Sequence, residues 1–345
     1  MKVRAGAVVD RTGLLRTSEA DFEHAPRTCR SEDELVKTIE RERRSVPLIS
    51  VCVCTYQRPD LLKHLLMSLA EQEGSNEWEH EIIVVDNDKD ASGSDVIKEL
   101  RRLFPGFPMT YEVEPQKNIS LARNKTVALA VGDLVAFIDD DETADRSWLK
   151  NLYATLRTTE SDAVFGPVIP QYPENCPKWI IKGRFFERPL ETDGQRVYYG
   201  RTTNALVRAR WLRMMERPFD PRYGLTGGED SDLFMRIRRE GAVFAWSEGG
   251  KVFECIGEAR LNLRWLLMRA FRGGQNTAEL SLKHAAVPRR FFHLVYRLAL
   301  CGLALLIAGP LMLVRFHLGV WWLRKAFSNA GQLSIIFPYR YKEYK

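Results

Sequence analysis

Three short apolar runs in the first half of the chain constrain its fold more than any other feature. They cover residues 48–55, 81–85 and 134–138 and are rich in β-branched side chains, as is typical of strands buried on both faces. Helical patterns of leucine and other apolar residues separate them. This alternation of strands and helices predicts an α/β fold with a mostly parallel sheet and helices on both faces.

Further elements follow from the same patterns and from cap and turn signals. We expect helices at 59–69, from Ser120 as N-cap to Ala130, at 148–156, 233–239 and 262–282, and strands at 111–113 and 163–168. We expect a linker around Pro105 and Pro108, irregular chain over the proline-containing residues 170–226, and a short helix with a capping box over residues 31–44.

Two of the apolar runs lead directly into acidic residues. Residues 86–88 are Asp-Asn-Asp and residues 139–141 are three aspartates. Ligands of open α/β sheets bind outside the carboxyl ends of the strands, and no Gly-x-Gly-x-x-Gly motif follows the first strand here. A nucleotide held by carboxylates is therefore expected, with Asp139 reaching the ribose and Asp141 a divalent ion that neutralises a diphosphate. The alternative is an acidic turn that caps the next helix.

A second acidic motif lies at residues 227–230, Gly-Gly-Glu-Asp, directly before a predicted helix. The glycine pair allows backbone and substrate to approach closely. Asp230 is therefore the candidate general base that removes a proton from an acceptor hydroxyl. The alternative is that Asp230 only stabilises the start of the helix, where aspartate is favoured.

Taken together and in order, five short motifs resemble those of family 2 glycosyltransferases, which have the GT-A fold. The motifs are residues 49–59 (ISVCVCTYQRP), 83–87 (IVVDN), 121–124 (LARN), 137–142 (FIDDDE) and 227–230 (GGED). The ordered match covers residues 48 to about 275. Residues 177–179, 203–204 and 264–274 further resemble the branch that builds succinoglycan-like bacterial polysaccharides.

The resemblance implies a GT-A-like α/β domain that transfers a sugar with inversion from a nucleotide diphosphate donor, such as a UDP-sugar. It implies as acceptor a membrane lipid-linked saccharide of surface polysaccharide synthesis, and as cofactor a divalent metal, Mg or Mn, at Asp141. It assigns catalysis to Asp230 and Glu229. Trp179 and Asn204 are the candidate acceptor contacts: the Trp179 ring can stack on an acceptor sugar, and the alternative is that it packs in the core or a loop. The implied donor-binding residues are Thr55, Tyr56, Arg58, Asp86, Asp88, Arg123, Asn124, Asp139 and Asp140.

One departure from the family pattern concerns the metal. Many relatives place a histidine shortly after the Glu-Asp helix, whereas this chain has no histidine between residues 81 and 283. The region reads Val-Phe-Glu-Cys-Ile at 252–256, so Glu254, Cys255 or water is expected in its place. Two other functions remain open: a nucleotidyltransferase of similar fold, and a catalytically inactive, membrane-bound assembly partner.

The last ninety residues differ in composition from the rest. Residues 256–345 contain fourteen Lys and Arg residues but three Glu residues, in a chain whose net charge is +6. Because this basic tail is rich in leucine, it predicts a membrane surface as partner and excludes nucleic acid. Its uncharged run, 299–314, is about 24 Å of helix, short of the ~30 Å hydrocarbon core, whereas extending the run back to Leu294 gives about 31 Å and includes Arg297. We expect Gly309-Pro310 to kink or break it.

Basic residues on both sides of the apolar run favour a re-entrant or in-plane segment on the cytoplasmic face of the membrane over a single span. The alternative is a buried helix pair of a soluble domain. The resulting domain plan is a polar extension at 1–47, a catalytic domain at 48–255 and a membrane-associating helical region at 256–345. The six cysteines form no Cys-x-x-Cys pair, which favours reduced thiols and a cytoplasmic catalytic domain.

Overall fold

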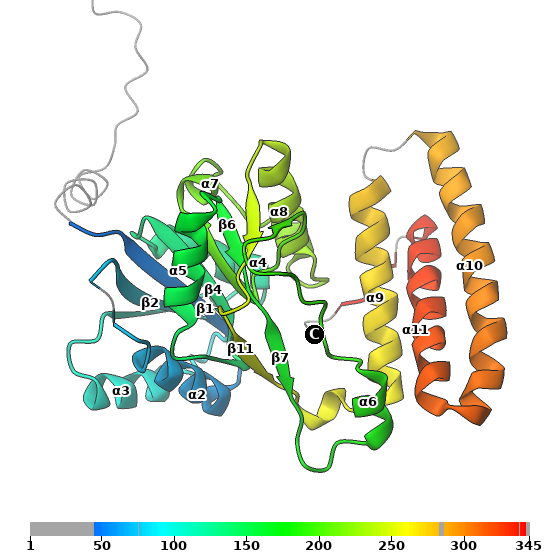
Figure 1. Ribbon diagram of the computed structural model, residues 1–345, viewed down its shortest axis with the longest axis horizontal. Helices are drawn as coiled ribbons and strands as arrows, with labels where there is room; N and C mark the ends of the chain where they lie inside the picture. Colours follow the sequence, from blue (N-terminus) through cyan, green and yellow to red (C-terminus); the bar gives the residue numbers. More distant parts are fainter. Residues whose placement is uncertain (1–44, 75, 283–285, 338, 343–345) are drawn as a thin grey trace, which may run out of the picture. The chain divides into compact units, whose positions relative to one another are not determined.

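A central eight-stranded sheet organises the computed structural model, which describes residues 45–74, 76–282, 286–337 and 339–342 (Figure 1). The strands lie in the order β3-β2-β1-β4-β9-β6-β10-β8. Their bounds are β1 (Leu48–Thr55), β2 (Glu79–Asp86), β3 (Met109–Val113), β4 (Leu134–Asp139), β6 (Ala163–Phe165), β8 (Arg196–Val197), β9 (Asn204–Arg208) and β10 (Phe244–Trp246). The helix predicted at 31–44 lies outside the described residues.

The four strands β3, β2, β1 and β4 pair in parallel, and this half of the sheet carries the predicted apolar runs. Strand β9 pairs antiparallel with both β4 and β6, β10 is parallel to β6, and β8 is antiparallel to β10. The prediction of a mostly parallel sheet is therefore confirmed. Strand β9 was not expected, because residues 170–226 were predicted to be irregular.

Helices cover both faces of the sheet, as predicted. Helices α2 (Pro59–Ala70), α3 (Ser94–Leu103) and α5 (Trp148–Thr158) bury their apolar side chains with one set of strand residues. Helices α4 (Ile119–Leu129), α7 (Arg210–Arg213) and α8 (Glu229–Arg239) pack on the alternate set. Because side chains alternate across a strand, the two sets mark opposite faces.

Three local predictions were wrong. Helix α3 occupies part of the segment that was expected to be a linker; its apolar residues recur at helical spacing, with Val96, Ile97 and Leu100 buried. Helix α4 begins two residues earlier than expected, because the N-cap is Asn118, whose side chain accepts a hydrogen bond from the backbone N–H of Leu121 (3.1 Å). Ser120 is a buried residue inside the helix.

The strand expected at 163–168 is two strands, because Gly166 and Pro167 interrupt it. Strand β6 stays in the central sheet, and β7 (Val168–Gln171) joins a small second sheet. In this second sheet β11 (Val252–Cys255) pairs in parallel with β7 and antiparallel with β5 (Glu142–Ala144). Strand β5 directly follows the three aspartates, so the small sheet fixes the chain on the far side of that cluster.

Three long helices follow the sheets: α9 (Leu263–Leu282), α10 (Val287–Val314) and α11 (Phe316–Leu333). Helix α11 lies between α9 and α10 and also contacts the short helix α6 (Lys178–Gly183) (Figure 1). Gly309-Pro310 was predicted to kink or break the apolar helix, and it does not break it, because α10 continues through Pro310 to Val314. A proline removes one backbone hydrogen bond, and here only the last turn follows it.

Candidate active site

The carboxyl ends of β1, β2 and β4 meet at one edge of the sheet. Thr55 pairs with Asp86 across β1 and β2, and Cys54 pairs with Asp139 across β1 and β4. This register follows from parallel pairing of the three predicted strands. It brings the two acidic clusters of the sequence to the same edge, where ligands of such sheets bind.

Asp140 is buried at this edge and is held by the last residue of β1 and by a residue of the loop that follows it. The Thr55 hydroxyl donates to Oδ2 of Asp140 (2.9 Å), and Nη1 of Arg58 donates to its Oδ1 (3.0 Å). Burial raises the pKa of the Asp140 carboxyl to about 6, while the positive charge of Arg58 opposes the rise. The same Nη1 of Arg58 also lies 3.3 Å from Oδ2 of Asp141.

Asp141 belongs to a chain of alternating charges. Nη2 of Arg260 lies 2.5 Å from Oδ2 of Asp141, and Nη1 of Arg260 donates to Glu254 (2.8 Å). The second oxygen of Glu254 accepts from Arg188 at 3.0 Å. Glu254 therefore holds two arginines in the region where relatives carry histidine, whereas Cys255 is exposed. Arg188 comes from a segment predicted to be irregular, and no sequence motif indicated it.

Arg123 joins the second acidic motif to the first. Its guanidinium pairs with Glu229 at the start of α8 and donates to Oδ1 of Asp139 at 3.1 Å. Arg123 and Glu229 are both buried. Burial raises the pKa values of Asp139 and Glu229, and the charge of Arg123 opposes both rises. Through this arginine, residues that are far apart in the sequence form one site.

Asp230 differs from its neighbour Glu229. Within the described part of the chain only Ser231 donates to its carboxylate, through the backbone N–H (2.6 Å) and the hydroxyl (3.2 Å), and no ion pair involves it. The N-cap of α8 is Gly228, so Asp230 does not cap the helix. Gly227 and Gly228 have φ values of 77° and 102°, the left-handed region that glycine adopts readily. The glycine pair thus turns the chain and leaves a partly exposed carboxylate beside the buried ion pairs.

The end of β2 has a different chemistry. Asp86 is fully buried and accepts hydrogen bonds from the Tyr111 hydroxyl (2.9 Å) and from the backbone N–H groups of Gly93 (2.7 Å) and Asp88 (3.0 Å). Asp88 is also buried. Lys117, between β3 and α4, donates to the hydroxyl of Tyr56 on the loop after β1 at 2.8 Å. Protein groups therefore already hold Asp86 in place.

Three other predicted site residues have their polar or ring contacts within the protein. The Asn124 amide donates a hydrogen bond to the Phe219 carbonyl (2.7 Å) and accepts one from the Phe219 backbone N–H (2.9 Å). Asn204 is buried; its amide donates to two backbone carbonyls and accepts from the Trp148 indole at 2.9 Å. The ring of Trp179 packs on Phe185 and on Phe316 of α11. These contacts support a structural role for all three side chains.

The acidic cluster fits a divalent ion only together with a substrate. No group of three or more His, Cys, Asp or Glu side chains in the described chain can hold a metal ion. Magnesium, however, is commonly bound by one or two carboxylates, with substrate phosphates and water completing the shell. Asp141 can supply such a carboxylate if its contact with Arg260 is exchanged. Glu142 lies beside it, buried, with its Oε1 unpaired and its pKa raised well above the usual value by burial.

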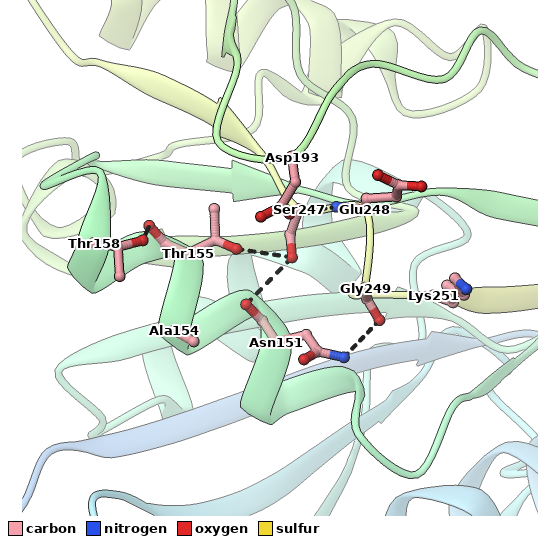
Figure 2. A pocket seen from close by; sticks show the side chains of 9 residues that line it. All are labelled: Asn151, Ala154, Thr155, Thr158, Asp193, Ser247, Glu248, Gly249 and Lys251. Carbon is pink, nitrogen blue, oxygen red and sulfur yellow. Dashed lines mark hydrogen bonds between the residues drawn. The ribbon is translucent and has the colours of Figure 1, made fainter.

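A polar groove lies elsewhere, between α5 and residues 247–251 (Figure 2). Its side chains bond one another: the Thr155 hydroxyl lies 2.9 Å from that of Ser247, and the Asn151 amide donates to the carbonyl of Gly249 at 2.8 Å. None of the predicted site residues lines this groove. The acidic edge of the sheet, and not the groove, is therefore the candidate active site.

Comparison with known proteins agrees with this architecture. The family model of Glycosyl transferase family 2 matches residues 50–216. The succinoglycan biosynthesis protein ExoM of Rhizobium meliloti (strain 1021) is 35% identical over 290 residues, which cover 83% of this chain and 92% of that protein. A glucosyl-dolichyl phosphate glucuronosyltransferase of Haloferax volcanii is 25% identical over 261 residues, 68% of this chain and 77% of that protein.

Among solved structures, the mannosyltransferase PcManGT from Pyrobaculum calidifontis, in complex with GDP-Man and Mn2+, superposes with a TM-score of 0.60. It is 18% identical, and the match covers 85% of this chain and 88% of that one, so it shows the fold. The predicted GT-A-like architecture is confirmed by this likeness and by the sheet described above. Together with the extended match to ExoM, these findings show that the chain belongs to glycosyl transferase family 2 and is a glycosyltransferase.

Proposed function

We propose that this glycosyltransferase moves a sugar from a UDP-sugar to a lipid-linked saccharide of surface polysaccharide synthesis, with inversion at the anomeric carbon and Asp230 as general base. One observation carries the proposal: Arg123 ties the start of α8 to Asp139, so that Asp230, which forms no ion pair with the described residues, lies close to this edge of the sheet. The homology to a succinoglycan biosynthesis protein supports the acceptor class.

In the proposed reaction the acceptor oxygen attacks the anomeric carbon and the bond from that carbon to the diphosphate oxygen breaks. The hydroxyl proton passes to Asp230, and the diphosphate leaves with the electron pair of the broken bond. Glu229 is fixed by Arg123, so it holds the first turn of α8 in place while Asp230 remains accessible. Arg58 and Arg260 lie at the acidic cluster and can bind the leaving diphosphate through charged hydrogen bonds.

Donor recognition is proposed for the remaining side chains of the cluster. Asp139 is assigned to the ribose, and Thr55 and Asp140 to the wall below it. Tyr56, with Lys117 beside it, and the end of β2 at Asp86 and Asp88 are assigned to the uracil side. A divalent ion at Asp141, Mg or Mn, would supply positive charge to the diphosphate when bound. Asn124 and Asn204 support the walls of the site through their backbone contacts.

Membrane association is proposed for the outer surface of α10. The helix places small side chains, Ala304 and Ala308, in buried contacts, whereas the large apolar Phe292, Leu306 and Leu313 are 71%, 75% and 91% exposed. Exposed apolar surface of this extent indicates contact with an apolar partner, and the basic composition of residues 256–345 indicates anionic headgroups. We therefore propose that α10 binds the cytoplasmic face of a membrane.

In the described chain one helix, over Arg290–Val314, is long and apolar enough to cross a membrane, with a mean hydropathy of 2.1. Its 25 residues correspond to about 37 Å, so length does not exclude a span, in line with the estimate for the run extended back to Leu294. Its contacts favour an in-plane position instead. Arg290 donates to the carbonyl of Leu282 at the end of α9 (3.2 Å), and Cys301 contacts the Ala326 carbonyl of α11 (3.4 Å).

Helix α10 is thus attached to α9 at its start and to α11 near its middle. At the far end Phe316 follows α10 after one residue and packs on Trp179 of α6. A helix held along its length in this way can lie in the membrane interface with its outer face immersed. We retain residues 48–255 as the proposed catalytic part and residues 256–345 as the proposed membrane-associating part, although both belong to one compact unit.

The membrane proposal is tested without deleting the tail, because α11 packs against α6 and α9 and its loss would disturb the fold. Leu306→Glu and Leu313→Glu place charges on the exposed face of α10. We expect both variants to fold and to lose binding to vesicles that contain anionic lipid in a flotation assay. Thr277→Ala, at an exposed position of α9, is the control. Unchanged vesicle binding of both charged variants would contradict the proposal.

The reaction is tested by incubating full-length protein with a panel of nucleotide sugars and lipid-linked saccharides. We expect release of UDP coupled to saccharide transfer, and NMR of the product should show the anomeric configuration opposite to that of the donor. Retention of configuration would contradict Asp230 as the base of a direct displacement. Transfer from a GDP-sugar and not from any UDP-sugar would correct the donor.

A further inference from the structure

Helix α9 presses against the two glycines that precede the candidate base. A Cβ atom at Gly227 would lie 3.1 Å from Nη1 of Arg272, and a Cβ atom at Gly228 would lie 3.1 Å from Nδ2 of Asn276. Arg272 and Asn276 are one helical turn apart, so they face the same way along α9. The Asn276 amide is partly exposed, and no hydrogen bond joins it to the described residues.

The location matters because a general base must lie within hydrogen-bond reach of the hydroxyl that it deprotonates. The acceptor sugar therefore has to lie against the segment that contains Gly228 and Asp230. On the donor side this segment is bordered by Arg123, which pairs with Glu229 and Asp139. Helix α9 brings the polar side chains of Arg272 and Asn276 beside Gly227 and Gly228 of this segment.

Helix α9 also connects this segment to the proposed membrane surface. It contacts α11 at two glycines whose backbones nearly touch the opposite helix: a Cβ atom at Gly274 would meet the Ser328 carbonyl oxygen, and one at Gly331 would meet that of Phe271. Helix α11 in turn packs along α10 (Figure 1). An acceptor with its lipid at α10 and its sugar at Asp230 would therefore extend alongside this helical layer.

We propose that Arg272 and Asn276 bind the acceptor: Arg272 the phosphate group that joins lipid and saccharide, and Asn276 a hydroxyl of the acceptor sugar. Guanidinium matches phosphate in charge and in its paired donors. A side-chain amide both donates and accepts hydrogen bonds, as a sugar hydroxyl requires. This inference rests on the proposed lipid-linked acceptor and adds the residues that would recognise it.

The test uses full-length protein and three reactions of one donor: hydrolysis without acceptor, transfer to an alkyl glycoside, and transfer to the same sugar on a lipid phosphate. The variants are Arg272→Gln, Arg272→Lys and Asn276→Ala, with Thr277→Ala as the matched control on the next, exposed position of α9. Donor affinity is measured in parallel by titration calorimetry.

We expect Arg272→Gln to raise KM for the phosphate-bearing acceptor by about ten-fold or more, the effect of losing a hydrogen bond to a charged group. KM for the alkyl glycoside should not change, and Arg272→Lys should restore part of the loss. Asn276→Ala should raise KM for both acceptors. Donor hydrolysis and donor affinity should match the control in every variant.

Other outcomes overturn the inference. An equal fall in donor hydrolysis and in both transfers would show that Arg272 and Asn276 only support the loop of the base. Unchanged KM values would remove both residues from the acceptor site while leaving the proposed reaction intact. If the wild-type protein transfers sugar to the alkyl glycoside but not to the lipid phosphate, the lipid-phosphate acceptor and the role of Arg272 are contradicted. The KM of Asn276→Ala for the alkyl glycoside would then decide the role of Asn276.

Discussion

Asp140 provides a prediction in which stability and activity change in opposite directions. Its carboxyl is buried, and burial raises its pKa from 3.8 to about 6 despite the neighbouring Arg58. At neutral pH the side chain is therefore ionised in a place that disfavours its charge. Asp140→Asn removes the charge and keeps nearly the same shape, and an asparagine oxygen can still accept the hydrogen bond from Thr55.

The size of the effect follows from the two pKa values. A difference between about 6 and 3.8 corresponds to about 3 kcal/mol, because one pKa unit corresponds to about 1.4 kcal/mol. Because the pKa of the carboxyl is higher in the folded than in the unfolded protein, the unfolded protein loses this proton at lower pH. The carboxyl therefore lowers the free energy of unfolding as the pH rises from the unfolded-state pKa to the folded-state pKa. The free energy of unfolding should therefore fall by about 3 kcal/mol between about pH 4 and pH 6 because of Asp140, and stay lower above that range.

We expect Asp140→Asn to be more stable than wild type by up to about 3 kcal/mol at pH 8, with the difference shrinking towards zero near pH 4. Urea unfolding of the full chain at several pH values, followed by tryptophan fluorescence, measures it. Exposed Asp90→Asn is the control and should show no such pH-dependent gain. UDP affinity should fall in Asp140→Asn alone. A variant that is less stable than wild type at pH 8, or equally stabilised at both pH values, would refute the reasoning.

Three further predictions test the site and its support. In calorimetry, UDP should bind more tightly with Mn2+ than with EDTA, and Asp141→Ala should abolish this difference. Equal affinity of the wild-type protein under both conditions would contradict a role of the metal in UDP binding. Asn124→Ala loses two bonds to the Phe219 backbone and should lower the free energy of unfolding in urea by about 1–3 kcal/mol. Weaker UDP binding at unchanged stability would instead make Asn124 a donor contact. Gly331→Ala puts a Cβ atom 1.9 Å from the Phe271 carbonyl oxygen, so its Tm should fall; a wild-type Tm would contradict this tight helix contact.

The core of the fold could be predicted because buried parallel strands leave continuous apolar runs in the sequence. Strands β1, β2 and β4 are six to eight residues long and contain such runs at 48–55, 82–85 and 134–138. Strand β9 could not be predicted in the same way. It has only five residues, begins with Asn204, and is recruited between β4 and β6 by tertiary pairing. Propensity is a weak guide where such pairing decides the outcome.

For the site, short motifs indicated which carboxylates would meet, but not what would neutralise them. Arg188 lies in a segment without recognisable pattern, and it reaches Glu254 from 66 positions away in the sequence. The pairing of Arg260 with Asp141 spans 119 positions. Such ion pairs depend on how the small second sheet places Glu254 beside the central one, which no local sequence signal specifies.

Helix α10 is longer than a count of uncharged residues predicts. Counting uncharged residues gave a segment of sixteen, whereas α10 has 28 residues and contains Arg297. The Arg297 side chain lies 3.4 Å from the Asn329 amide oxygen of α11, so the helix continues past a charge that has a local polar contact. A run-length criterion could not anticipate this, because the contact is made by another helix.

The base assignment is tested most directly by Asp230→Asn in single-turnover and steady-state assays with donor and acceptor. Asparagine keeps the shape of the side chain and can accept the bond from the Ser231 backbone, so donor affinity should be preserved. Turnover should fall by about 10²-fold or more, because proton removal in the transition state is lost. Near-normal turnover, or a loss explained by weaker donor binding, would contradict the account.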